Sequence, residues 1–216
     1  MRLLTNLKAV LFDLDDTLVQ TKVTRYQAII ALGERFYNYS ISEAMIDQYW
    51  GMPHQLFYTS LFKEVDTDVE RILKYRSQLC EQFPNAAYQD TTPTIEYLAN
   101  KYILGMITAS GKEMIDSEIA PLHLPLDKFL FIQTSEDTHY HKPDPRVFIP
   151  ALHTLAGYDI SSEQVLYVGD SLKDYQAAKD AGLQFIGIAD RTTSGQSFRQ
   201  AGAQYVTSLS AFTQLV

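Results

Sequence analysis

The sequence predicts an α/β fold, in which a parallel sheet forms the core and an all-helical segment is inserted after the first strand. Short apolar runs recur along the chain, and helical patterns separate them. These runs do not alternate apolar with polar residues, which is typical of strands buried on both faces, and helices between them favour parallel crossover units. One long region between the first and second runs shows helical patterns alone.

The predicted strands stand far enough apart for a helix to connect each one to the next. In chain order they are Ala9–Phe12, Ile103–Ile107, Phe129–Ile132, Val165–Val168 and Phe185–Ile188. Helix-start signals fall between them. Thr92-Pro93 and Asp144-Pro145 each offer a capping residue followed by proline, and Ser110–Glu113 has capping-box spacing directly after a strand.

The inserted region lies between about residue 21 and residue 84 and contains no convincing strand. Its predicted helices are Thr24–Tyr39, Glu43–Tyr49, Gln55–Lys63 and Asp68–Phe83. A capping-box spacing from Ser40 to Glu43 supports the start of the second helix. We therefore expect residues 1–19 to carry the first core strand, residues 20–86 to form a helical cap, and residues 87–216 to complete the core.

Composition and charge exclude several classes of function. The 216 residues are 46% hydrophobic and 20% charged, as in an ordinary globular protein, and the formal net charge is -8. An acidic chain without a Lys/Arg cluster argues against a nucleic-acid partner and favours a cation. No apolar run is long enough to span a membrane. The oligomeric state stays open.

Cysteine content and the amino-terminal stretch indicate the compartment. Cys80 is the one cysteine, so neither an internal disulfide nor a cysteine-based zinc site can form, which suits a reducing environment. Lys8 and Asp13 interrupt the first apolar stretch, and no signal-peptide cleavage pattern follows it. We expect a cytoplasmic protein.

Polar residues follow the predicted strands at the points where the strands end. Going along the chain, these are Asp13 and Asp15, then Thr108 to Ser110, then His141 to Pro143, and finally Gly169 to Asp174. In open parallel sheets ligands bind at the carboxyl ends of the strands. We therefore expect these groups to meet at one edge of the sheet.

The acids among them would repel one another without a counterion. Those that this edge can gather are Asp13, Asp15, Asp170 and Asp174, and the same segments supply Lys142 as a nearby cation. Such a cluster either raises some of its pKa values or binds a divalent cation, and an all-oxygen site suits Mg²⁺. With Mg²⁺ and Lys142 present the crevice can accept a phosphate dianion, and the helix after the second strand offers backbone N–H groups to it.

Two of the acids have the spacing for different tasks on one substrate. A carboxylate beside Mg²⁺ can attack phosphorus to form an aspartyl-phosphate, while a second carboxyl with a raised pKa can hold a proton for the leaving group. Asp13 and Asp15 stand two residues apart in an extended segment, so both side chains point to the same side. Leu14 points to the opposite side.

In order and spacing, these segments resemble the signature motifs of the haloacid dehalogenase superfamily. The matching motifs are Asp13-Leu-Asp-Asp-Thr17, Thr108, Lys142-Pro143, and Gly169-Asp170-Ser171 with Asp174. The resemblance covers nearly the whole chain. It implies a Rossmann-like, doubly wound parallel-sheet core with a C1-type helical cap, as in phosphoglycolate phosphatases and β-phosphoglucomutases.

The resemblance also implies roles for the acids. Asp13 would be the nucleophile and a metal ligand. Asp15 would be the general acid and then the base, with its backbone carbonyl on Mg²⁺. Asp170 would bind the metal, and Asp174 would support the metal ligands.

The resemblance further implies a phosphate-binding set. Thr108 and Lys142 would hold the phosphoryl group, and Ala109 and Ser110 complete the predicted segment. Many relatives have Thr-Asn where this chain has Thr108-Ala109. That difference removes one possible contact to phosphate or substrate.

The acids that follow the nucleophile indicate the reaction class. The dehalogenases that named the superfamily lack the second aspartate, because displacing halide needs no proton donor, so Asp15 points to phosphoryl transfer. Asp16 stands where glycine is common in the family. We expect it to be a solvated turn carboxylate that points away from the site and takes no part in the chemistry.

The cap would set the choice of substrate, because the core addresses phosphate alone. Trp50, His54 and Gln55 are the candidates to face the crevice. Trp50, Leu56 and Phe57 also suit packing between cap helices, and we favour that interpretation for them.

Two pairs of charged or titratable residues have more than one interpretation. Lys22 and Arg25, near the cap hinge, could meet a second anionic group or could be surface charges. His139 and His141 could suggest a metal site, but no third ligand accompanies them, so we expect an ordinary loop.

The function that these residues predict is Mg²⁺-dependent hydrolysis of a small phosphorylated metabolite through an aspartyl-phosphate at Asp13. A phosphomutase would use the same core, with a sugar hydroxyl in place of water as acceptor. A non-catalytic phosphate-binding protein could keep the fold. The presence of Asp13, Asp15, Lys142 and Asp170 argues against that last alternative.

Overall fold

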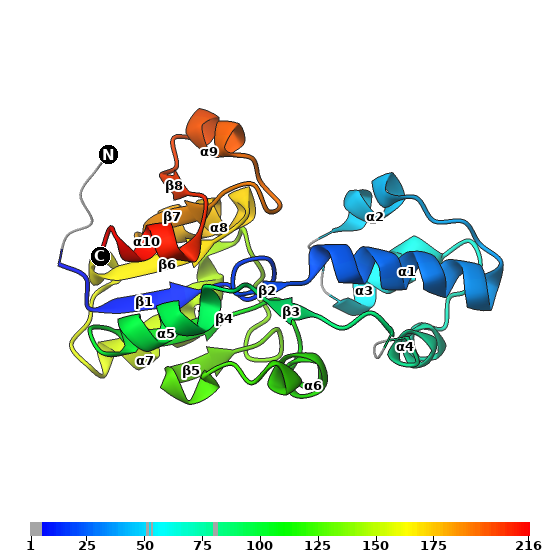
Figure 1. Cartoon of the computed structure of the whole chain (residues 1–216), viewed down its shortest axis with the longest axis horizontal. Helices are drawn as coiled ribbons and strands as arrows, with labels where there is room; N and C mark the ends of the chain where they lie inside the picture. Colours follow the sequence, from blue (N-terminus) through cyan, green and yellow to red (C-terminus); the bar gives the residue numbers. More distant parts are fainter. Residues whose placement is uncertain (1–5, 51, 53, 80–81) are drawn as a thin grey trace.

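The computed structural model describes residues 6–50, 52, 54–79 and 82–216, so Cys80 lies outside the described residues. Figure 1 shows a sheet with helices on both sides, and a separate group of helices, α1–α4, beyond one end of the strands. The predicted α/β fold with a helical insertion is confirmed. No helix within the described ranges is long and apolar enough to cross a membrane.

Six strands of the described chain form the core sheet, in the order β5-β4-β1-β6-β7-β8, and every pairing is parallel. Their bounds are β1 Ala9–Phe12, β4 Ile103–Ile107, β5 Phe129–Gln133, β6 Val165–Gly169, β7 Gln184–Ile188 and β8 Tyr205–Val206. All but β8 coincide with a predicted strand to within one residue at each end. β8 has 2 residues and is too short to leave a periodic pattern.

The order of the strands predicts where the ligand-binding crevice lies. The chain leaves β1 toward β4 and β5 on one side, and later returns to β6 and β7 on the other side. Strand order therefore reverses at β1, between β4 and β6. In open α/β sheets the ligand crevice lies at such a switch point, outside the carboxyl ends of the strands.

Helices cover both faces of the sheet. The side chains of β1 alternate between the two faces, so each face presents apolar groups for helices to pack on. Val10 and Phe12 lie in one hydrophobic cluster with residues of α5 and α10, and Ala9 and Leu11 lie in another with residues of α7 and α8. The core helices are α5 Thr91–Ala99, α6 Lys112–Met114, α7 Ile149–Ala156, α8 Leu172–Asp180, α9 Gly195–Ala201 and α10 Leu209–Thr213.

One of the three predicted helix starts in the core is confirmed. The Asp144 side chain accepts a hydrogen bond from the Arg146 N–H, and Pro145 opens the short 3₁₀ turn that leads into α7. The start predicted at Thr92-Pro93 is wrong, because α5 begins at Thr91. Proline is tolerated there because N–H groups of the first helical turn have no partner within the helix.

The third predicted start, the capping box of Ser110 to Glu113, is also wrong. Gly111 precedes α6 and makes no side-chain cap. The Ser110 hydroxyl instead donates to Asp15 at 2.8 Å, so the contact to the site replaces the local cap. A π-helical segment, Ile115–Ile119, continues directly from α6.

The helices of the insertion are α1 Lys22–Tyr37, α2 Glu43–Tyr49, α3 His54–Phe62 and α4 Val69–Ser77. They enclose a hydrophobic cluster of their own, which includes Leu32, Ile46, Phe62 and Ile72. The antiparallel pair of β2 Val19–Gln20 and β3 Ala86–Ala87 lies where the insertion leaves and rejoins the core.

The capping box predicted at Ser40 is wrong. Ser42 is the residue that caps α2, and its side chain accepts a hydrogen bond from the Met45 N–H at 3.3 Å. Helix α4 also ends earlier than predicted, at Ser77.

Candidate active site

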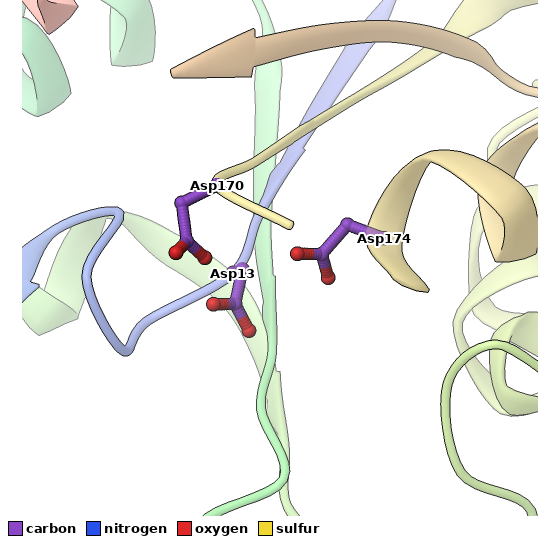
Figure 2. A group of neighbouring side chains, drawn as sticks. All are labelled: Asp13, Asp170 and Asp174. Atoms are coloured by element: carbon purple, nitrogen blue, oxygen red, sulfur yellow. The ribbon is translucent and has the colours of Figure 1, made fainter. Parts of the chain in front are cut away.

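Three carboxylates gather at the carboxyl ends of β1 and β6. Oxygen atoms of Asp13, Asp170 and Asp174 lie within 4.8 Å of one another, and all three residues are buried. Figure 2 shows Asp13 and Asp170 at the ends of adjacent strands, with Asp174 reaching toward them from the first turn of α8. Sequence reasoning predicted that these acids would meet.

The close approach of Asp174 depends on a glycine at the end of β6. A Cβ atom added to Gly169 would lie 2.6 Å from the Asp174 Cγ, which is closer than real contacts allow. Asp174 is also fixed by Ser171: each residue's side chain bonds the backbone N–H of the other, which forms a capping box.

Lys142 supplies the positive charge of the cluster. Its Nζ lies 2.5 Å from Asp13 Oδ1 and 2.7 Å from Asp174 Oδ1. It also donates to the hydroxyl of Tyr167 at 2.8 Å. The lysine therefore lies between two acids of the group, as a partner for buried carboxylates should.

One buried lysine does not neutralise three buried carboxylates, and the pKa values respond. Burial raises the pKa of Asp13 to about 8, against the lowering effect of Lys142. Burial and the nearby Asp174 raise the pKa of Asp170 well above its usual range. Burial alone would lower the pKa of Lys142, but Asp13 and Asp174 outweigh it and raise this pKa. Without a further cation the group therefore holds protons, and a bound cation would replace them.

The donor chemistry of this group fits Mg²⁺. The ligand atoms are all carboxylate oxygens, which is the set that hard divalent cations prefer, and the excess negative charge favours such an ion. Thr192 donates its hydroxyl proton to Asp170, which holds that carboxylate in place. The candidate metal group found among the described residues consists of carboxylates.

Asp15 is held apart from the three clustered acids. Its Oδ1 lies 2.8 Å from the Nη2 of Arg25, and its Oδ2 accepts the Ser110 hydroxyl at 2.8 Å. Burial raises the pKa of Asp15, but Arg25 and the hydrogen bonds outweigh that effect, so the pKa lies below its usual value. The raised pKa that sequence reasoning expected of this proton carrier is therefore wrong for the state seen here.

The carboxylate of Asp15 is also not part of the group that could hold a metal. The expected metal contact was through its backbone carbonyl, and that contact stays a prediction. Asp13 and Asp15 nevertheless line the same cavity.

The predicted phosphate-binding residues line that cavity too. Thr108 and Ser110 are buried, and the Thr108 Oγ1 accepts a hydrogen bond from the Ser110 N–H at 3.0 Å. Ala109 is exposed and lies on the cavity wall with Lys142. All eight residues predicted for catalysis, phosphate binding or metal binding thus line one cavity: Asp13, Asp15, Thr108, Ala109, Ser110, Lys142, Asp170 and Asp174.

The cavity has a volume of about 440 Å³ and lies between the core and the inserted helices. His54 and Trp50 line it, as the sequence suggested, and Trp50 also packs against Tyr26 and Phe57. Gln55 is exposed and is not among the lining residues, so its predicted place facing the crevice is wrong.

Two further expectations for single residues are corrected. Leu56 is 52% exposed and does not pack between cap helices. Asp16 is buried rather than solvated, because its carboxylate accepts hydrogen bonds from the N–H groups of Thr21 and Lys22 at the start of α1. Its backbone has a φ of 54°, which explains why glycine suits this position. Asp16 also lines the cavity, so the expectation that it points away from the site is wrong, although it does not belong to the group of clustered acids.

The structure adds residues that sequence reasoning missed. Tyr167 contacts Lys142 from within β6, and a tyrosine in an otherwise aliphatic buried strand was an available signal. Arg191 stacks on Tyr88 and donates to the backbone carbonyls of Asp16 and Thr17, with no signal in the sequence around it. Thr192 likewise comes from a loop without a motif.

This fold and this group of acids form an acidic, metal-compatible centre next to the inserted helices. The sequence profile of haloacid dehalogenase-like hydrolases matches residues 10–188. The chain belongs to this family, and the membership predicted from its motifs is confirmed.

Similar proteins agree with that assignment. The glyceraldehyde 3-phosphate phosphatase of Methanopyrus kandleri is 29% identical over 201 residues, which cover 84% of this chain and 84% of that protein. The pyrophosphatase PpaX of Anoxybacillus flavithermus is 24% identical over 186 residues, covering 85% and 84%. A solved haloacid dehalogenase-like hydrolase from Bacteroides fragilis superposes with a TM-score of 0.76 at 27% identity, over 95% of this chain and 99% of that one. The predicted enzyme class, a phosphoric monoester hydrolase of this family, is confirmed.

Proposed function

We propose that the protein is a Mg²⁺-dependent phosphatase that hydrolyses a small phosphomonoester through an aspartyl-phosphate at Asp13. The observation that carries the proposal is the group of Asp13, Asp170 and Asp174 within 4.8 Å, with Lys142 in contact with two of its members. Membership of a hydrolase family with phosphatase relatives supports it.

The carboxylates of Asp13 and Asp170 would hold the metal, with Asp174 supporting them and the Asp15 carbonyl as a further ligand. When bound, Mg²⁺ would neutralise charge on the carboxylates and on the phosphoryl oxygens. Thr108 and Lys142 would bind the phosphoryl group, and Lys142 would thereby exchange part of its contact with Asp13 for one with substrate.

The chain's own residues divide the two chemical steps. In the first, an oxygen of Asp13 bonds to phosphorus and the bond to the leaving oxygen breaks, while Asp15 gives that oxygen its proton. In the second, water attacks the same phosphorus, Asp15 takes a proton from the water, and the bond to Asp13 breaks. The residue returns unchanged, and inorganic phosphate leaves.

Against the effect of burial, Arg25 and Ser110 lower the pKa of Asp15 and so favour its carboxylate form, which is the form that the second step needs. The first step needs a proton on it, and we propose that this proton arrives with the substrate. Phosphate monoesters have a second pKa of about 6, so a fraction carries a proton at neutral pH.

Residues 20–86 would act as the cap, with their helices closing the site against bulk water. Polar contacts join the described part of this segment to the core, and three of them reach it from the cap helices and from the residue that follows α2. Arg25 meets Asp15, Arg76 lies 2.5 Å from Glu118, and the Lys173 ammonium donates to the Trp50 carbonyl at 3.2 Å. These contacts favour a closed arrangement that still leaves a substrate-sized cavity.

A small phosphorylated metabolite is the proposed substrate, and a phosphomutase remains the alternative with the same core chemistry. The relatives reported above are hydrolases and favour water as the acceptor. A cytoplasmic location and the absence of nucleic-acid and membrane partners stay expectations from the sequence.

The test is hydrolysis of p-nitrophenyl phosphate, glycerol phosphate and inorganic pyrophosphate by the purified protein, with Mg²⁺ and after exhaustive EDTA treatment. We expect Mg²⁺-dependent release of phosphate from the monoesters, and loss of activity in Asp13→Asn. Full rates after EDTA treatment would contradict the metal assignment. Substantial turnover by Asp13→Asn would contradict the nucleophile. Hydrolysis of pyrophosphate alone would contradict the monoester class.

A further inference from the structure

A second set of polar side chains lines the cavity from the side of the cap helices. Arg25 comes from α1, His54 from α3 and Arg76 from α4. None of them belongs to the group of clustered acids or to the predicted phosphate-binding segment. Their place in the cavity lining raises the question of what part of a substrate they contact.

Arg25 is a buried cation whose hydrogen bonding is incomplete. Its side chain is 16% exposed, and its ion pair with Asp15 runs through Nη2 at 2.8 Å. The same Nη2 approaches Ser110 Oγ at 3.4 Å and Met114 Sδ at 2.9 Å. The Nε is buried and has no hydrogen-bond partner within the described ranges. Asp15 Oδ1, which faces Arg25 across the ion pair, is likewise buried without a hydrogen bond among the described residues, so both atoms can pair with groups of a bound ligand.

His54, on helix α3, has the same kind of buried nitrogen as Arg25. Its Nε2 is buried and has no hydrogen-bond partner among the residues that the structure describes. Burial, and then the nearby Arg76 and Arg25, lower the pKa of the ring to about 4, so the imidazole is neutral near pH 7. A neutral imidazole can still donate one N–H, and two unpartnered buried nitrogens therefore belong to residues that line one cavity.

Two neighbouring cations of the cap differ from Arg25, because each forms an ion pair with an acid that takes no part in the proposed reaction. Arg76 pairs with Glu118 at 2.5 Å and also donates to the Tyr58 hydroxyl at 3.1 Å. Lys22 pairs with Asp47 at 3.5 Å. Arg25 meets its carboxylate through one nitrogen, whereas a guanidinium can grip an anionic group through two.

We propose that Arg25 and His54 form a subsite for a second anionic oxygen group of the substrate, separate from the phosphoryl group that is transferred. The inference rests on the proposed phosphatase function and narrows its substrates to phosphomonoesters that carry a carboxylate or a second phosphate. Arg25 touches Asp15, the residue that would protonate the leaving oxygen. The subsite therefore lies on the leaving-group side, and the second anion belongs on a short leaving group.

The test compares three monoesters with a two-carbon leaving group: 2-phosphoglycolate, ethylene glycol bisphosphate and 2-hydroxyethyl phosphate. The first carries a carboxylate, the second a further phosphate, and the third is the uncharged control. We expect kcat/KM for at least one of the two anionic esters to exceed that of the control by about tenfold or more, as a charge-assisted hydrogen bond gives. Which ester benefits identifies the anion.

In the variants the quantity to compare is the preference, which is the ratio of kcat/KM for the favoured anionic ester to kcat/KM for the uncharged control. The rate alone is not suitable, because Arg25 also contacts Asp15. Arg25→Met should lower the preference about tenfold, and His54→Leu, which leaves the contact with Asp15 in place, should lower it several-fold. Arg35→Met is the matched control, because Arg35 is an exposed arginine of the same helix that does not line the cavity. It should keep the preference of the wild type.

Equal kcat/KM for all three esters in the wild type would overturn the subsite, and so would an unchanged preference in both cavity variants. Either result, with hydrolysis of the esters intact, leaves the phosphatase proposal standing. Failure to hydrolyse any phosphate ester would instead contradict the phosphatase function. His54→Leu decides the matter alone if Arg25→Met does not fold.

Discussion

The ammonium group of Lys142 lies 2.5 Å from the carboxylate of Asp13, a residue 129 positions earlier in the chain. Both side chains are almost fully buried, at 11% and 8% exposure. The parallel sheet brings them together, because Asp13 follows β1 and the loop of Lys142 follows β5. Their contact joins the proposed nucleophile to the proposed phosphate-binding group.

Removing this lysine should harm both stability and activity. In Lys142→Met, Asp13 and Asp174 lose their shared buried cation, and breaking a buried pair in this way costs roughly 3–5 kcal/mol. We expect a lower free energy of unfolding in urea without Mg²⁺, partial recovery when Mg²⁺ is added, and at least about a hundredfold loss in kcat/KM. Lys179→Met, which replaces an exposed lysine of α8 outside the cavity lining, is the control and should change little.

Metal binding should stabilise the fold, and more so at higher pH. Burial raises the pKa of Asp13 to about 8, so between about pH 4 and pH 8 the folded protein holds a proton that the unfolded chain has released. The metal-free protein therefore loses stability as pH rises through this window. Mg²⁺ must displace that proton, so its affinity rises with pH.

The measurement is urea unfolding at pH 6 and pH 8, with and without Mg²⁺. At a concentration a hundredfold above its dissociation constant the ion should add about 2.7 kcal/mol. The gain at a fixed concentration should be larger at pH 8, and Asp170→Asn should reduce it at both values. An equal gain in Asp170→Asn would argue against this group as the site.

Replacing Asp15 should affect poor leaving groups most. An alkyl oxygen needs a proton as it leaves, whereas p-nitrophenolate leaves without one. For Asp15→Ala we expect a loss with glycerol phosphate that exceeds the loss with p-nitrophenyl phosphate by at least about tenfold in single-turnover rates. Ser110→Ala removes one hydrogen bond to Asp15 and should show the same pattern more weakly. Equal losses on both substrates would remove the acid role.

Arg191 should act as a positioning residue for the turn that carries Asp15. Its guanidinium stacks on Tyr88 with 3.4 Å between the Cζ atom and the ring centroid, and donates to the carbonyls of Asp16 and Thr17. Arg191→Met should lower kcat about tenfold with little change in KM, because the turn loses its anchor while the phosphate contacts remain. Arg199→Met, an exposed arginine on α9, is the control. A change confined to KM would contradict a positioning role.

Much of the core could be predicted from the sequence because each buried strand is a short apolar run. The strand from Ile103 to Ile107 was predicted with its observed ends. Helix starts were harder, since several cap residues compete for one helix. Ser42 caps α2 in place of Ser40, and Ser110 bonds Asp15 in place of capping α6.

The acids of the site could be predicted because the carboxyl ends of parallel strands must meet. The partners that arrive from the cap could not, because no periodic pattern says which face of α1 turns toward the core. Arg25 therefore stood with Lys22 as an open pair, yet it is the residue that sets the charge state of Asp15. Arg191 and Thr192 act from a loop, where contacts depend on the tertiary fold alone.

The central claim is that the phosphoryl group passes through Asp13. The most direct measurement mixes Asp15→Asn with p-nitrophenyl phosphate and Mg²⁺, quenches within the first turnover in acid, and locates the phosphoryl group by peptide mass spectrometry. We predict a burst of p-nitrophenol matched by phosphorylation of Asp13, since the leaving group needs no acid while the second step lacks its base. A burst without a phosphoryl group on Asp13, or the same burst in Asp13→Asn, would contradict the account.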